Sequence, residues 1–189
     1  MLRLPGLIDI HVHLRDPGGT HKEDFATGTA AALAGGVVAV LDMPNNTPPI
    51  VDKETLDNKA ELASQKARCD FGFYLGASGD NAGKPIASRT LAGLKIYIDE
   101  TYGPLRVSDL ATVMAHFRLW PRDKPIALHA EGLATAMAIG LAQLYDRSVH
   151  ICHVSRSAEI QLIKQAKERG AKITCEGVSL DWPPIEYSE

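Results

Sequence analysis

The sequence predicts an α/β protein in which repeated strand–helix units build a parallel sheet of about seven strands. Short apolar runs rich in Val and Ile alternate along the chain with longer segments of helical periodicity. The runs are nearly continuous in apolar character, which is typical of strands buried on both faces of a parallel sheet. With 189 residues, the chain is long enough to bury one sizeable core.

The candidate elements follow one another in a regular order. Seven runs have the composition and length of strands, and they cover residues 6–12, 37–43, 69–77, 93–98, 125–130, 148–154 and 171–176. Helical periodicity marks five segments between them, namely residues 23–36, 52–67, 107–117, 131–146 and 157–170. Glycines end two of these segments where helix C-caps are expected, at Gly35, Gly36 and Gly170. The link between the third and fourth strands has no clear helical pattern.

Two parallel architectures fit this order, an open doubly wound sheet and a (β/α) barrel. A doubly wound dinucleotide-binding sheet would carry G-x-G-x-x-G after its first strand. The segment "DPGGT" at residues 16–20 is a poor match to that motif. The barrel is therefore the favoured architecture.

Composition limits the partners that the chain can have. It is 45% hydrophobic and 23% charged with a net charge of -3, so no positive field attracts nucleic acid or anionic lipid. No apolar run approaches the roughly 18 residues that a membrane helix needs. The cysteines Cys69, Cys152 and Cys175 fit neither a disulfide framework nor a paired-cysteine zinc motif. We expect a cytoplasmic protein without nucleic-acid or membrane partners.

Four histidines lie at the ends of predicted strands. His11 and His13 are two residues apart, so they project from the same face of the first strand. His129 and His153 end the fifth and sixth strands. Each of them taken singly fits a structural histidine bonded to the backbone. In a parallel barrel, however, these strand ends meet on one rim, where active sites gather, and imidazole is a common metal ligand.

Lys95 lies in the apolar run "GLKIY" with no carboxylate nearby in the sequence. A buried ammonium is costly unless it is neutralised or paired. One interpretation is a lysine whose amine reaches solvent at the rim of the barrel. The other is a neutral amine that takes up carbon dioxide, so that the resulting carbamate bridges two metal ions as a carboxylate would. The residues alone leave both open.

The segments "DIHVHLRDP", "MPNNTPP", "GLKIY", "LHAE" and "ICHVSR", in this order, resemble the dihydroorotases of the amidohydrolase superfamily. The resemblance runs from residue 2 to 176 and is greatest to the dihydroorotase domain of the animal multifunctional pyrimidine-biosynthesis enzyme and to similar bacterial proteins. It implies a TIM-barrel-like (β/α)8 metal-dependent hydrolase of cyclic amide C–N bonds. The implied reaction interconverts dihydroorotate and N-carbamoyl-L-aspartate in pyrimidine biosynthesis.

The resemblance also implies roles for particular residues. Zinc is the expected cofactor, with two ions and room for a third. His11 and His13 would bind the first ion, His129 and His153 the second, and a carboxylated Lys95 would bridge them.

Further residues match the family at the substrate and at an additional zinc ion. Arg15 and Asn45 match the positions that hold the substrate carboxylate, a role that suits the planar guanidinium fork. Taken alone, Arg15 would be a solvated loop charge and Asn45 a turn former. Cys152 and Glu176 match residues at a possible additional zinc, although both fit ordinary buried strand positions as well.

After Glu176 the chain departs from the family pattern. The family continues to an eighth strand with a Ser-Asp-His-Ala-Pro-His motif, whose aspartate transfers the proton, whereas here the sequence reads "GVSLDWPPIEYSE". We therefore divide the chain into an incomplete barrel, residues 1–176, and a divergent tail, residues 177–189, and assign no catalytic residue. We expect the dihydroorotase activity of the chain to be weak or lost. We also expect the open side of the barrel to be covered by the tail or by a second copy of the chain in a homo-oligomer.

Two other functions remain as alternatives. The first is a hydantoinase- or allantoinase-like cyclic amidase. The Arg15 and Asn45 positions favour a substrate with a carboxylate, and therefore dihydroorotate, over hydantoin or allantoin. The second is a non-catalytic partner subunit in a pyrimidine-biosynthesis complex, with aspartate transcarbamoylase or an intact dihydroorotase as its partner.

Overall fold

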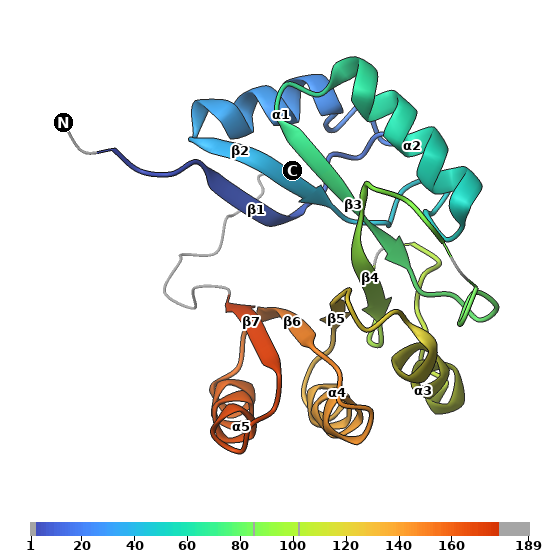
Figure 1. Ribbon diagram of the computed structural model, residues 1–189, viewed down its shortest axis with the longest axis vertical. Helices are drawn as coiled ribbons and strands as arrows, with labels where there is room; N and C mark the ends of the chain where they lie inside the picture. The colour runs from blue at the N-terminus through green and yellow to red at the C-terminus, as the bar shows by residue number, and fades with distance from the viewer. Residues whose placement is uncertain (1–2, 85, 102, 178–189) are drawn as a thin grey trace, which may run out of the picture.

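The computed structural model describes residues 3–84, 86–101 and 103–177, which form one curled parallel sheet with helices on its outer side (Figure 1). The strands are β1 Leu7–Val12, β2 Val37–Asp42, β3 Asp70–Gly76, β4 Leu91–Tyr97, β5 Ile126–His129, β6 Val149–Val154 and β7 Ile173–Gly177. The helices are α1 Phe25–Ala34, α2 Lys53–Lys66, α3 Leu110–Leu119, α4 Leu133–Leu144 and α5 Ser157–Glu168. All seven strands and five helices expected from the sequence are confirmed, as is the non-helical link from β3 to β4. Most of the divergent tail lies outside the described residues.

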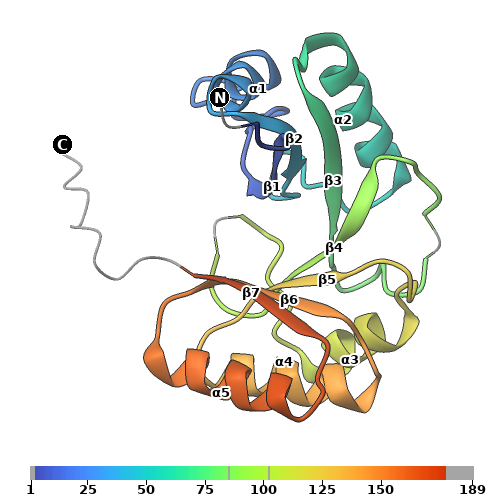
Figure 2. The same ribbon diagram turned by 60° about the vertical axis from the view of Figure 1, so that its left-hand side comes forward.

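The order of strands in the sheet decides between the two architectures. Strands that follow one another in the chain also lie side by side, in the order β1 to β7, and every neighbouring pair is parallel. A doubly wound sheet reverses its strand order at a switch point, which does not occur among the described strands. The sheet bends so strongly that β5–β7 run across the line of β1–β3 (Figure 2). The fold is the curved wall of a TIM-barrel-like structure, with β1 and β7 as its edge strands.

Three helices begin at aspartates whose side chains accept hydrogen bonds from backbone N–H groups in the first turn. Asp24 caps α1, Asp52 caps α2 in a capping box with Thr55, and Asp109 caps α3. Gly36 and Gly170 directly follow the C-caps of α1 and α5, and both have a positive φ, at 85° and 86°. The sequence therefore fixes the helix ends locally, and with them the entry to the next strand.

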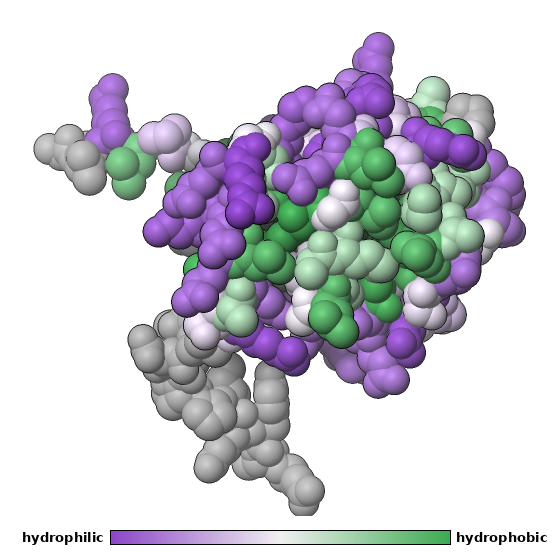
Figure 3. All heavy atoms as spheres, turned by 90° about the horizontal axis from the view of Figure 1, so that it is seen from below, coloured by the Kyte–Doolittle hydropathy of each residue, from purple (hydrophilic) through white to green (hydrophobic). Residues whose placement is uncertain are grey.

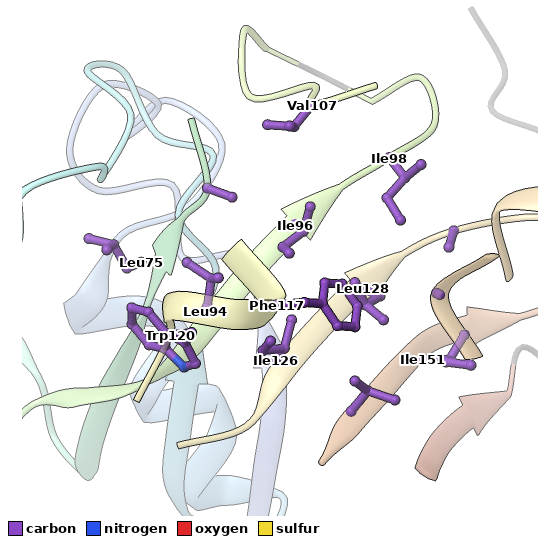
Figure 4. Packing of buried hydrophobic residues seen from close by; sticks show 14 of the residues in the cluster. Leu75, Leu94, Ile96, Ile98, Val107, Phe117, Trp120, Ile126, Leu128 and Ile151 are labelled. Atoms are coloured by element: carbon purple, nitrogen blue, oxygen red, sulfur yellow. The ribbon is translucent and has the colours of Figure 1, made fainter. Parts of the chain in front are cut away.

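The main core lies between the sheet and the helices. Phe117 of α3 packs near Ile126 and Leu128 of β5 (Figure 4). Alternation along each strand then decides which side chains face the other way, into the barrel. In β4, Leu94 and Ile96 belong to this core, so Lys95 faces inward.

Strand β1 departs from the expectation of a strand buried on both faces. Leu7, Ile8 and Ile10 are 56%, 64% and 37% exposed, because β1 is an edge strand with a hydrogen-bonded neighbour on one side only among the described strands. In the described part of the chain, no helix is both long and apolar enough to cross a membrane.

Candidate metal centre

The histidines predicted as ligands gather on the inner side of the sheet at the carboxyl ends of the strands. The ring centroids of His11 and His13 are 5.3 Å apart, and those of His11 and His153 are 5.6 Å apart. His129 lies next to His153, with 3.2 Å between His129 Nδ1 and His153 Nε2. Side chains from β1, β5 and β6 therefore meet although up to 142 positions separate them in the chain.

His153 reaches this group only because β6 is irregular. A regular strand would send Cys152 and His153 to opposite faces. The pairing of β6 with β7 shifts register between Ile151 and Val154, and His153 has a φ of 37°. This bulge turns the His153 side chain toward the side where Cys152 already lies. Sequence periodicity gives no sign of it.

Lys95 is completely buried, so a lysine that extends its amine to solvent is wrong for this position. Its Nζ lies 2.8 Å from Cys152 Sγ and 5.2 Å from the centroid of the Tyr97 ring. No carboxylate forms a salt bridge with it among the described residues. A buried amine without a carboxylate partner is costly as an ammonium, so the surroundings of Lys95 suit an amine that is chemically modified.

A second group of donors lies beside the histidines. The ligand atoms of His11, Cys152 and Glu176 all lie within 4.8 Å of one another. His11 Nδ1 forms a short contact with Glu176 Oε1, which also accepts a 3.2 Å hydrogen bond from the backbone N–H of His153. The structure thus joins Cys152 and Glu176, which the sequence had paired, to a histidine that the sequence had assigned to a different ion.

The protonation of the histidines follows from their surroundings. Burial, then the positive charge of Arg15, lowers the pKa of His13 to about 4. Burial is likewise the main cause that lowers the pKa of His153 to about 4. Burial also acts to lower the pKa of His11, but hydrogen bonds to Cys152 and Glu176 outweigh it and raise that pKa to about 9. At neutral pH, His13 and His153 therefore carry the lone pairs that a metal requires.

Asn45 fixes the orientation of His13. His13 Nδ1 lies 2.8 Å from Asn45 Oδ1. Because an amide oxygen only accepts hydrogen bonds, Nδ1 is the donor, which leaves the lone pair on Nε2. Asn45 is therefore more than a turn former after Pro44. Arg15 and Asn45 line one pocket, together with Gly18, His21 and Thr47, among others.

A buried ion pair behind this pocket was not anticipated from the sequence. Lys59 of α2 is completely buried, and its Nζ lies 2.7 Å from Asp42 Oδ2, 2.7 Å from Asn46 Oδ1 and 2.9 Å from the carbonyl oxygen of Met43. The sequence gives one sign of this pair. Lys59 is spaced three residues after Leu56 and four before Ala63, so it lies on the side of α2 that faces the core.

The donor set fits zinc. Imidazole, thiolate and carboxylate are the groups that bind zinc in proteins, and the structure gathers all three types on one partly buried surface. The neutral rings of His13 and His153 strengthen the fit, because a cation would not approach protonated imidazoles.

Comparison with known sequences gives a consistent set of relatives. Residues 2–175 match the amidohydrolase family. The chain is 54% identical over 177 residues to the multifunctional protein CAD of Squalus acanthias and 47% identical over 180 residues to the multifunctional protein pyr1-3 of Dictyostelium discoideum, spanning 93% of this chain and 8% of each relative. It is 32% identical over 200 residues to the dihydroorotase of Methanosphaera stadtmanae, spanning 88% of this chain and 45% of that enzyme. The chain therefore spans less than half the length of these relatives.

Solved structures support the same fold. The L-hydantoinase of Arthrobacter aurescens superimposes with a TM-score of 0.79 at 20% identity, over 92% of this chain and 47% of that one. An inactive dihydroorotase-like domain of the Chaetomium thermophilum CAD-like multifunctional protein superimposes with a TM-score of 0.74 at 28% identity, over 91% of this chain and 51% of that one.

Proposed function

We propose that this chain, which belongs to the amidohydrolase family, carries the metal-binding half of a dihydroorotase-type cyclic amidohydrolase. The observation that supports this most is the meeting of the predicted donors from β1, β4, β5, β6 and β7 in one connected group. The substrate pair in this proposal is dihydroorotate and N-carbamoyl-L-aspartate, since the relatives include dihydroorotases.

In this proposal two zinc ions are held at the rim by the five ligands that the family resemblance implies: His11, His13, Lys95, His129 and His153. Lys95 takes part as a carbamate, and its complete burial without a carboxylate partner among the described residues supports this role. A third zinc would sit between Cys152 and Glu176, and the closeness of His11 to both supports it. Bound zinc lowers the pKa of a water ligand and polarises a carbonyl group.

The chain's own residues then bind and orient the substrate. The guanidinium of Arg15 is suited to grip a carboxylate through two parallel hydrogen bonds. Asn45 uses its Oδ1 to accept from His13, so its amide NH₂ remains to donate to the same carboxylate. Both residues line one pocket, which favours a substrate that carries a carboxylate over the uncharged rings of hydantoin and allantoin.

The 189 residues contain no Ser-Asp-His-Ala-Pro-His segment, so the aspartate that the resemblance expects for proton transfer is not among them. We therefore assign no catalytic residue and propose that this chain by itself turns over dihydroorotate weakly or not at all. A non-catalytic role beside aspartate transcarbamoylase remains the second candidate, because an inactive dihydroorotase-like domain shares this fold at 28% identity. We also place the chain in the cytoplasm, in keeping with its three free thiols.

The proposal includes a homo-oligomer, supported by the outer face of α4. Leu133 and Leu144 are 89% and 67% exposed, and Ala136 and Gly140 lie between them on the same side of the helix. A Cβ built at Gly140 would meet nothing within 4 Å. Solvent-facing stripes of helices are ordinarily polar, whereas Figure 3 shows an apolar patch on the side of the molecule where α3 and α4 lie.

A second copy of the chain fits this stripe. Under a two-fold axis the two α4 helices cross antiparallel at the small residues, which places Leu133 of one copy near Leu144 of the other. The three helices α3–α5 present a face of about 18 by 27 Å, or about 490 Å², which is at the lower limit of what a specific dimer buries on each partner. Charged groups lie at the two ends of α4 rather than within the stripe. They form the Glu131–Arg156 ion pair at one end and the Asp146–Lys172 ion pair at the other.

The test of the proposed function is a zinc analysis of the dialysed chain combined with assays of ring opening on dihydroorotate, hydantoin and allantoin. We expect zinc to be retained, and slow turnover, if any, on dihydroorotate alone. A chain that retains no zinc, or that opens allantoin faster than dihydroorotate, would contradict the proposal. Normal dihydroorotase turnover would contradict the part of it that concerns proton transfer.

A further inference from the structure

His150 lies on the inner side of the sheet, directly below the donor group formed by His11, Cys152 and Glu176. It precedes Cys152 by two residues on β6, and its partner across the parallel pair, Thr174, precedes Glu176 by two residues on β7. Because side chains alternate along a strand, His150 and Thr174 form one layer and Cys152 and Glu176 the next layer toward the rim. The side chain of His150 is only 12% exposed.

Both ring nitrogens of His150 face groups on β7. Nδ1 lies 2.9 Å from Thr174 Oγ1, and Nε2 lies 3.4 Å from Glu176 Oε2. Nε2 is buried and forms no hydrogen bond among the described residues, so the carboxylate of Glu176 is the group that it faces. A carboxylate oxygen only accepts hydrogen bonds, so the tautomer that suits this place has its proton on Nε2 and accepts from the Thr174 hydroxyl at Nδ1. The two strands thus place the ring between the Thr174 hydroxyl and the Glu176 carboxylate.

We propose that His150 is a positioning residue for Glu176. With Thr174 behind it, His150 directs its Nε2–H to Oε2, so that Oε1 is left facing His11 and Cys152 as a metal ligand. The inference rests on the proposed additional metal site, and it names a residue and a role that the ligand set does not include. Metal ligands are commonly oriented by such outer hydrogen bonds, whose loss weakens metal binding.

The geometry also predicts where the effect of His150 is largest. At 3.4 Å, the contact with Glu176 Oε2 is longer than an N–H···O hydrogen bond, whereas the contact of His11 with Oε1 is short. In the metal-free chain His11 is therefore the stronger partner of Glu176. If His11 and Oε1 were to hold a metal ion, His11 would no longer donate to Oε1, and His150 would remain as the side chain that orients the carboxylate. The loss of His150 is thus expected to weaken metal binding more than it weakens the fold.

The experiment titrates the full chain with cadmium and follows the ultraviolet charge-transfer band of the thiolate–cadmium bond. The parent carries Cys69→Ser and Cys175→Ser, so that Cys152 is the thiol that reports, and Cys152→Ser supplies the blank. His150→Phe keeps the ring volume without the donor, and His150→Gln returns an N–H donor. Thr174→Val and Thr174→Ser form a second matched pair, in which only the serine keeps the hydroxyl.

We expect His150→Phe to bind cadmium about 10- to 100-fold more weakly than the parent, with His150→Gln close to the parent. Thr174→Val should weaken binding in the same direction, and Thr174→Ser should not. The midpoint of urea unfolding without metal, measured for each variant, shows that the binding loss is not a loss of fold. Equal cadmium affinity in the parent and in a folded His150→Phe chain would overturn the inference alone. A parent without the band, or a band that survives in Cys152→Ser, would overturn the proposed metal site and the inference with it.

Discussion

Lys59 and Asp42 form an ion pair of 2.7 Å in which both side chains are buried, at 0% and 1% exposure. Asp42 also accepts a 2.8 Å hydrogen bond from the backbone N–H of Leu14, and Lys59 contacts Asn46. Leu14 lies between His13 and Arg15, and Asn46 follows Asn45. The pair therefore joins α2 to the two loops that carry Arg15 and Asn45, the residues expected to bind the substrate carboxylate. Its two opposite charges face each other inside the core.

Removing one member of this pair should destabilise the chain strongly. Lys59→Met leaves the Asp42 carboxylate buried without its cation, so we expect the free energy of unfolding to fall by about 3 to 5 kcal/mol. Asp42→Asn should have a comparable effect. The double variant should lose less than the sum of the two, because it no longer buries an unpaired charge. Urea unfolding of the four chains measures this, and additive effects would show that the two groups are not coupled.

Lys95 is predicted to carry carbon dioxide when zinc is present. Zinc-loaded chain prepared with ¹³C-labelled bicarbonate should show a carbamate carbon resonance, because the buried amine has Cys152 but no carboxylate beside it among the described residues. Lys95→Met should lack the resonance and retain less zinc. Lys164→Met is the control, since that lysine is exposed on α5 and its loss should leave both the resonance and the zinc content unchanged. A resonance that persists in Lys95→Met would place the carbamate elsewhere.

The metal-free chain should be most stable near pH 6.5, the ordinary pKa of histidine. His13 and His153 have pKa values of about 4 in the fold, first through burial, so below pH 6.5 the unfolded chain binds more protons and stability falls. His11 has a pKa of about 9, because its hydrogen bonds to Cys152 and Glu176 outweigh burial. Its contribution is complete below pH 6.5 and is lost as the pH rises through 9.

Urea unfolding in the presence of a chelator, from about pH 5 to pH 9, tests this dependence. His11→Gln should remove much of the decline on the alkaline side while leaving the acid side in place. Stability that climbs steadily from pH 6.5 to pH 9 in the parent would show that the His11–Glu176 contact does not raise the pKa of His11.

The outer face of α4 should decide the oligomeric state. Gly140→Glu puts a charge at the point where two α4 helices would approach each other most closely, in a space that is open within the single chain. We expect a dimer in the parent and a monomer in Gly140→Glu, by light scattering behind a sizing column. Asn58→Glu, on the exposed side of α2 and away from the α3–α5 face (Figure 1), is the control and should remain dimeric. A monomeric parent would refute the dimer, and a dimeric Gly140→Glu would move the interface elsewhere.

The sequence predicts the repeating parts of this structure well, because apolar periodicity and capping residues such as Asp24 and Asp52 act over a few positions. It also places His11 and His13 on one face, since alternation along a regular strand settles that. It does not predict the bulge that turns His153 inward, nor the meeting of His11 with Glu176, which lies 165 positions away. The sequence does not predict the Lys59–Asp42 ion pair for a related reason. In the sequence, the two residues have the appearance of unrelated surface charges, and only the fold brings them together.

The central claim is that the inner rim of this sheet is a zinc site, and anomalous diffraction at the zinc edge tests it most directly. Crystals grown with zinc should give anomalous peaks beside His11, His13, His129 and His153, with density for an added carboxylate on Lys95, and a further peak against Cys152 and Glu176. An absence of anomalous signal at the rim, with the four imidazoles bonded only to protein groups, would contradict the account.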